Sequence, residues 1–119
     1  MRVLCGLVLL LSGAVVQAHA YLQKAVPADG SVVGAPPSSI VLSFSEPARL
    51  TALWVHQDAG PKQKIGSLPG APARQIIVSL PQLAPGRYMV SWRVVGADGH
   101  VVPGQIRFTI SPADRSTRS

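Results

Sequence analysis

Leu-Ala-Pro-Gly-Arg-Tyr, residues 83–88, opens a segment in which apolar residues alternate with other residues as far as Val94. A period of two is typical of a β-strand that has one buried face. A Leu-x-Pro-Gly-x-Tyr run at the start of a long strand resembles the tyrosine corner of Greek-key sandwiches, in which the phenol bonds to backbone a few residues upstream. We therefore expect Tyr88 to have a structural role in a Greek-key arrangement of strands.

The same period of two recurs along the chain beyond residue 18. Further alternating segments occupy 40–44, 53–55, 76–80 and 106–110. Proline and glycine clusters, which are typical of turns, lie between them at 27–30, 34–37, 60–61, 69–72, 85–86 and 103–104. No stretch of this part of the chain has a sustained helical period. The pattern predicts an all-β domain, a small Greek-key β-barrel or sandwich of the cupredoxin-like or immunoglobulin-like kind.

Residues 1–18 have the three parts of a secretory signal peptide. A basic residue precedes an almost wholly apolar stretch at 3–11, and Val16-Gln17-Ala18 places small or modest residues at the positions that a signal peptidase inspects. A retained transmembrane helix would need about 20 apolar residues. We expect export to the periplasm and a mature chain that begins at His19. Cleavage after Ala20 also satisfies the small-x-small rule and would remove His19.

The mature chain is long enough for one small domain but not for two. We expect that domain to span residues 19–110 and to be followed by a flexible polar tail at 111–119. Cys5 is the only cysteine in the sequence and leaves with the leader, so the exported protein would have neither a disulfide nor a thiolate ligand. We expect a soluble monomer with no membrane segment of its own.

The chain carries 11 Lys and Arg residues against five Asp and Glu residues. Its basic residues are spread singly, without the interleaved aromatic residues of a nucleic-acid surface, so we expect no nucleic-acid partner. An excess of positive charge suits an acidic partner or an anionic surface, but we interpret it as serving solubility. No Gly-x-Ser-x-Gly motif or glycine-rich phosphate loop is present, and a lone Glu46 cannot run a two-carboxylate mechanism. We expect no catalytic residues.

Asp98-Gly99-His100 is the strongest candidate for a metal site. In an extended segment, side chains two residues apart point to the same side, and Gly99 lets the backbone bend. Asp-Gly is also a common turn dipeptide, so a plain turn is the alternative. If His19 is the first residue, its amine and ring can chelate one ion. Three nitrogens and a carboxylate then favour Cu(II) over Zn(II), which prefers a tetrahedral ligand set.

Several motifs together resemble the CopC family of periplasmic copper-binding proteins over essentially the whole mature chain. They are His19-Ala20-Tyr21-Leu22, Pro27-Ala28-Asp29-Gly30, Leu42-Ser43-Phe44-Ser45-Glu46-Pro47, Gly86-Arg87-Tyr88 and the run from Trp92 through His100 to Gly104. The resemblance implies cleavage before the histidine and one Cu(II) per monomer, bound by His19, Asp98 and His100. It also implies that Glu46 lies near the site and supports it without binding the metal.

The resemblance implies a protein, not an enzyme, that sequesters or carries Cu(II) for copper resistance or homeostasis. Members of the family often work beside a separate copper transporter of the inner membrane. An alternative is a copper-dependent oxidative enzyme, because a copper-binding N-terminal histidine also occurs in copper monooxygenases. A third alternative, an adhesion or scaffold sandwich without metal, becomes attractive only if His19 is removed.

The remaining candidates have structural explanations. Many members of the family hold Cu(I) in a methionine-rich loop, but the mature chain keeps only Met89, so we expect no second copper site and no Cu(I)/Cu(II) exchange. We expect His56 to be an exposed residue at a strand end. Trp54 and Trp92 are interpreted as packing residues, and Asp29 as a turn residue.

Overall fold

The computed structural model describes residues 20–112, so the leader, His19 and residues 113–119 lie outside the described part of the chain. The described residues form seven strands and no helix. The strands are β1 (Leu22–Val26), β2 (Ser31–Val33), β3 (Ser39–Gln57), β4 (Gln63–Lys64), β5 (Ala73–Ser79), β6 (Gly86–Gly96) and β7 (Val101–Ile110). The all-β prediction is confirmed.

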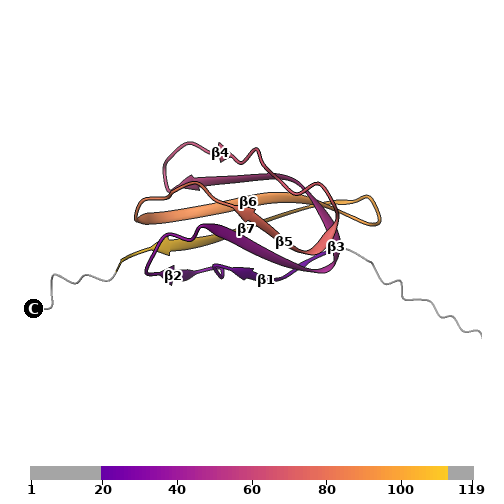
Figure 1. Ribbon diagram of the computed structural model, residues 1–119, viewed down its shortest axis with the longest axis horizontal. Helices are drawn as coiled ribbons and strands as arrows, with labels where there is room; N and C mark the ends of the chain where they lie inside the picture. The colour runs from indigo at the N-terminus through magenta and orange to yellow at the C-terminus, as the bar shows by residue number, and fades with distance from the viewer. Residues whose placement is uncertain (1–19, 113–119) are drawn as a thin grey trace, which may run out of the picture.

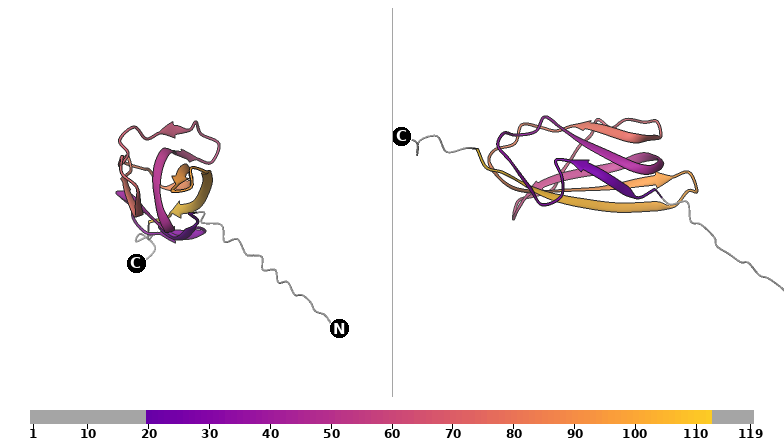
Figure 2. Two further views of the ribbon diagram at one scale, coloured as in Figure 1. Left: turned by 90° about the vertical axis from the view of Figure 1, so that its right-hand side faces the viewer. Right: turned by 90° about the horizontal axis from the view of Figure 1, so that it is seen from below.

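β3, with 19 residues, belongs to both layers of the sandwich. Its first half pairs antiparallel with β1 and β5, and its second half pairs with β4 and β6. The pairing with β5 shifts register between Ser43 and Ala48, where β3 curves from one layer into the other (Figure 1). β7 follows β6 in a hairpin and pairs in parallel with β2. Seen end-on, the strands curl around one interior (Figure 2).

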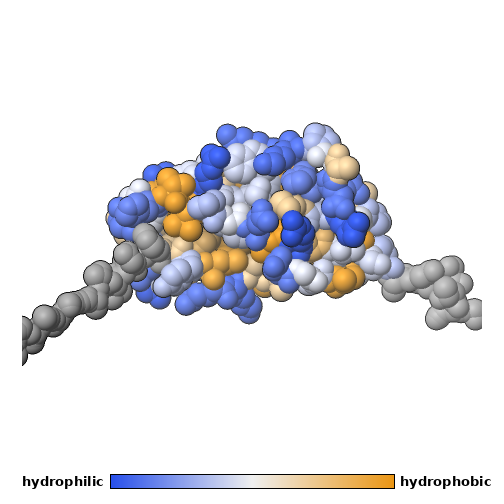
Figure 3. All heavy atoms as spheres, turned by 180° about the vertical axis from the view of Figure 1, so that it is seen from behind, coloured by the Kyte–Doolittle hydropathy of each residue, from blue (hydrophilic) through white to orange (hydrophobic). Residues whose placement is uncertain are grey.

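The core consists of the inward positions of the alternating segments. Its most deeply buried large side chains are Ile40, Leu42, Leu53, Val78, Val90, Val94, Ile106, Phe108 and Ile110. Each such side chain contributes roughly 1.5–3 kcal/mol through removal of apolar surface from water. On the face behind the view of Figure 1, the apolar side chains that remain visible form small patches between hydrophilic ones (Figure 3). The predicted period of two therefore distinguishes the buried positions from the exposed ones.

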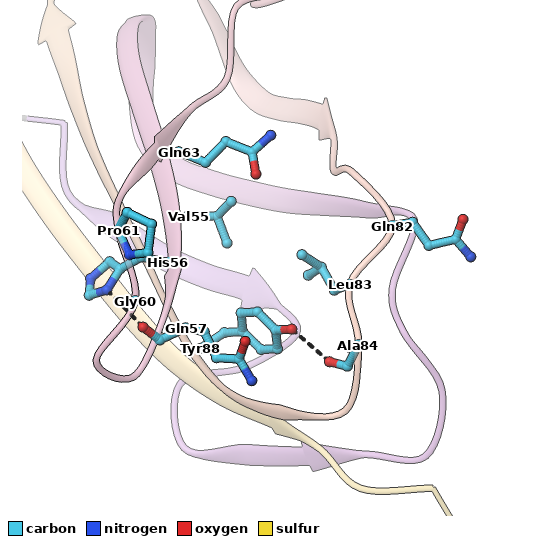
Figure 4. A pocket seen from close by; sticks show the side chains of 10 residues that line it. All are labelled: Val55, His56, Gln57, Gly60, Pro61, Gln63, Gln82, Leu83, Ala84 and Tyr88. Atoms are coloured by element: carbon cyan, nitrogen blue, oxygen red, sulfur yellow. Dashed lines mark hydrogen bonds between the residues drawn. The ribbon is translucent and has the colours of Figure 1, made fainter.

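The tyrosine corner is confirmed. The Tyr88 hydroxyl donates a hydrogen bond of 2.6 Å to the carbonyl oxygen of Ala84, four residues upstream (Figure 4). Only 6% of Tyr88 is exposed, and its ring stacks on Phe108 with the centroids 5.8 Å apart. The bond therefore ties the segment before β6 to the strand that it enters.

The expectation of a turn at 103–104 is wrong, because Pro103 and Gly104 lie inside β7. β2 pairs with β7 only from Phe108 onward, so Pro103 lies where one side of β7 has no strand beside it and a missing N–H is tolerated. Gly104 lies opposite Trp92, and a Cβ at this position would come within 2.6 Å of the indole. The glycine therefore allows the buried Trp92 to lie under the backbone of β7.

Replacement of Tyr88 with Phe is expected to lower the free energy of unfolding by about 1–2 kcal/mol, because the Ala84 carbonyl loses its partner in a part-buried position. Urea denaturation followed by circular dichroism measures this change. Tyr21→Phe is the matched control, since Tyr21 is 59% exposed, and it should change stability little. Equal stabilities for the two variants would contradict a structural role of the corner.

Candidate metal centre

Residues 96–100 form the tight turn between β6 and β7. The Gly96 N–H donates to the His100 carbonyl at 3.1 Å, and the Gly99 N–H donates to the Gly96 carbonyl at 3.0 Å. Gly99 has a φ of +85°, a conformation that glycine adopts at little cost. The segment is thus a turn and not the extended stretch considered from the sequence.

The turn still brings the two predicted ligands of this segment together. One carboxylate oxygen of Asp98, Oδ1, accepts a hydrogen bond of 3.0 Å from the His100 backbone N–H. The other, Oδ2, lies 3.0 Å from Nδ1 of the His100 ring. The Asp98 side chain is 27% exposed and the His100 side chain 69% exposed. Both are therefore accessible to an ion from solvent without opening of the fold.

The separation of Oδ2 and Nδ1 fits two adjacent ligands of one Cu(II) ion. In a tetragonal site with bonds of about 2.0 Å, neighbouring donor atoms lie about 2.8 Å apart. The Asp98 and His100 atoms already lie at 3.0 Å, and a proton between them makes the contact a hydrogen bond. A metal ion that replaced this proton would find both donors nearly in place.

The described chain begins beside this pair. Ala20 is fully buried. The Tyr21 N–H donates to Ser45 Oγ at 3.0 Å, and the Ser45 N–H donates to the Tyr21 carbonyl at 2.9 Å. These two hydrogen bonds fix the start of the domain on β3.

Gly96 lies close to both the start of the domain and the Asp98 side chain. A Cβ on Gly96 would lie 3.2 Å from Asp98 Oδ1 and 3.8 Å from the Ala20 nitrogen. Ala20 and His100 also line one shallow, mostly apolar hollow of about 410 Å³. The nitrogen that carries residue 19 is therefore close to Asp98 and His100, although His19 itself lies outside the described residues.

Glu46 lies beyond the alternating segment at 40–44, yet it is still part of a strand. It is half-buried inside β3, immediately after Ser45, because the strand continues past Pro47 into the second layer. Within residues 20–112 no group of three or more His, Cys, Asp or Glu side chains could hold a metal ion. Within the described part of the chain, Asp98 and His100 thus form a pair.

His56 lies far from the turn. It is the next-to-last residue of β3, opposite Met89, whereas Ala48 of the same strand lies opposite Gly96. Its Nδ1 is 3.3 Å from the Gln57 carbonyl, and Figure 4 shows the ring on the side of β3 away from Leu83. The residue is half-buried, not exposed as expected, but it belongs to the opposite end of the sandwich.

Two further predictions concern aromatic and turn residues. Trp92 is 2% exposed, as expected of a packing residue, whereas Trp54 is only half-buried. Asp29 lies in the turn between β1 and β2, where its Oδ1 accepts a hydrogen bond of 2.8 Å from the Arg107 N–H. The turn assignment is confirmed, and the packing assignment holds for Trp92 better than for Trp54.

Comparison with known proteins identifies the relationship. Residues 22–111 match the model of the CopC domain. The chain belongs to the CopC family. It is 39% identical over 101 residues to protein YobA of Escherichia coli K12, covering 80% of this chain and 81% of that protein. It is 32% identical over 117 residues to copper resistance protein C of Pseudomonas syringae pv. tomato, covering 85% of this chain and 87% of that protein.

The fold agrees with that of a solved CopC structure. The crystal structure of CopC from Methylosinus trichosporium OB3b superposes with a TM-score of 0.69 at 28% identity, covering 81% of this chain and 97% of that one. Membership of CopC gives the chain a copper-related function, and its relative from Pseudomonas syringae is named a copper resistance protein. Among residues 20–112 there is no helix long and apolar enough to cross a membrane.

Asp98→Ala is expected to lower the free energy of unfolding of the copper-free CopC domain by about 1 kcal/mol, because the turn loses the bond to the His100 N–H. Chemical denaturation measures the change. Asp58→Ala is the control, since the Asp58 side chain makes an exposed ion pair with Arg87, and such pairs typically contribute about 0–1 kcal/mol. If Asp98→Ala cost no more than the control, the carboxylate would not be ordering the turn.

Proposed function

We propose that this CopC protein is an exported carrier or buffer that binds one Cu(II) ion per monomer in the periplasm and serves copper resistance or homeostasis. The observation that carries the proposal is the Asp98–His100 pair, with donor atoms 3.0 Å apart, beside the nitrogen of Ala20. A chain cut after Ala18 would present the amine and ring of His19 at this point.

The proposed ligand set combines His19, Asp98 and His100. The amine and ring Nδ1 of His19 would close a six-membered chelate, His100 would bind through Nδ1, and Asp98 would bind through Oδ2. Three nitrogens and one oxygen in a tetragonal arrangement suit Cu(II), which also tops the affinity order of divalent metals. Glu46, which adjoins the Ser45 that anchors Tyr21, would support the ligands from β3.

The proposed role follows from the openness of the site. His100 is 69% exposed, so copper can bind and leave without unfolding of a strand. The carboxylate of Asp98 would fill a position that an oxygen-activating copper site keeps open, which favours storage or transfer over oxidation. Met89 is the only methionine in residues 20–112, so that range offers no thioether set for a Cu(I) site. A separate inner-membrane copper transporter is the proposed partner.

His100→Ala is expected to weaken Cu(II) binding by more than about 100-fold, since even residues that only support metal ligands contribute 10-fold to 100-fold. Competition against a Cu(II) chelator measures the affinity, and circular dichroism shows whether the variant is folded. His56→Ala is the matched control, because His56 lies at the other end of β3 and should leave the affinity unchanged.

Wild-type affinity in the folded His100→Ala variant would show that the proposed site is misplaced. A loss of affinity in His56→Ala as large as that in His100→Ala would contradict the proposal equally, because it would move the copper to the opposite end of the sandwich.

A further inference from the structure

A second hollow lies on the outer face of the sandwich, away from the turn. It has a volume of about 510 Å³ and is lined in part by Trp54, Ser91 and Gln105. These three residues lie in one row across the sheet, because Trp54 of β3 is opposite Ser91 of β6, which is opposite Gln105 of β7. Side chains in one such row share a face of the sheet. The half-exposed Trp54 therefore forms a wall of the hollow.

Two cations converge on Trp54. Lys62, in the loop that precedes β4, places Nζ 5.6 Å from the ring centroid, and Arg93 of β6 places its guanidinium carbon 5.1 Å from it. Both distances are within the range of cation–π attraction. Neither residue forms an ion pair with another described residue, and the described residues that line the hollow include no acid. Two like charges held together in this way are relieved by an anion.

A buried hydroxyl also lines the hollow. Ser91 Oγ has no hydrogen-bond partner among the described residues. Buried hydroxyl groups normally have one, and a hydroxyl can donate one hydrogen bond. Lys62 and Arg93 would attract a carboxylate, and it could accept the Ser91 bond after a covering side chain moved aside, because the oxygen itself is buried.

The hollow shares one lining residue with the apolar hollow beside the candidate metal centre. Pro103 lines both this hollow and the apolar hollow beside Tyr21 and His100. Tyr21 and Val101 are 59% and 57% exposed at the latter. A protein that docked over His100 and Pro103 would therefore also border the hollow at Trp54.

We propose that this face docks an acidic segment of the protein that exchanges copper with the chain, and that one carboxylate of the segment binds at the edge of Trp54 beside Lys62 and Arg93. The choice of this face rests on the proposed function, because the partner would exchange copper at the neighbouring site. The choice of an acidic segment rests on the uncompensated positive charge of the hollow. A membrane surface fits less well, because other bases lie in the opposite layer, on Lys24 of β1 and Arg74 of β5. Positive charge is thus not gathered on one flat side.

The test is an NMR titration of the exported, copper-free chain with a blocked tetra-glutamate peptide, with tetra-glutamine as the matched control. The reporter is the indole N–H signal of Trp54, which Trp54→Phe identifies. We expect this signal to shift saturably with tetra-glutamate and to stay in place with tetra-glutamine. Added salt should weaken the binding.

Variants locate the contact. Lys62→Gln and Arg93→Gln are each expected to weaken binding of tetra-glutamate by about twofold to fivefold. Lys24→Gln and Arg74→Gln remove the same charge from the other layer and should have no more than a small effect. Equal effects of all four variants, or equal binding of the two peptides, would overturn the proposal. Binding to phosphatidylglycerol vesicles without binding to tetra-glutamate would overturn it in favour of a lipid surface.

Copper affinity and tetra-glutamate binding, both measured on His100→Ala and on the wild-type chain, separate the two proposals. If that variant keeps wild-type copper affinity but still binds tetra-glutamate at Trp54, the copper site is wrong and the acidic docking hollow stands. If the variant binds Cu(II) much more weakly while the wild-type chain does not bind tetra-glutamate, the copper site stands and the docking proposal fails.

Discussion

The structure depends on the pairing of one strand, β3, with partners in both layers. Its first half is held by β1 and β5, and its second half by β6. A slip of one residue would turn every inward side chain of the strand to solvent, including Leu42 and Leu53, so the buried pattern fixes the register of both halves at once. The bend between Ser43 and Ala48 then sets how the two layers meet.

The register of β3 brings three segments together: the bend of β3, the turn between β6 and β7, and the start of the domain. The candidate metal centre lies where they meet. Ala48 of β3 pairs with Gly96 at the end of β6, so the following turn with Asp98 and His100 lies beside the bend. Ser45, three residues earlier on β3, holds Tyr21 by two hydrogen bonds. The start of the domain and the turn are nearly eighty residues apart in sequence, and only the two-layer pairing of β3 brings them to one end. The proposed copper site would thus depend on strand register.

Sequence predicted the features that depend on local geometry. The corner at Tyr88 and the Asp98–His100 pair each involve residues within four positions of one another, so spacing alone was informative. Features that depend on distant partners were missed. β3 continues past Glu46 because each half has its own neighbours, and Gly104 lies in a strand because Trp92 fills the space where its side chain would be. The exposure of Trp54 likewise follows from cross-strand neighbours that no local pattern reveals.

The proposed copper site requires an exported chain that begins with His19, beside Asp98 and His100. Intact mass spectrometry of the protein exported by its host, copper-free and after one equivalent of Cu(II), tests this requirement. We expect a mass that begins at His19 and retains one copper ion. A chain that begins at Tyr21 or at Met1, or one that begins at His19 and retains no copper, would contradict it.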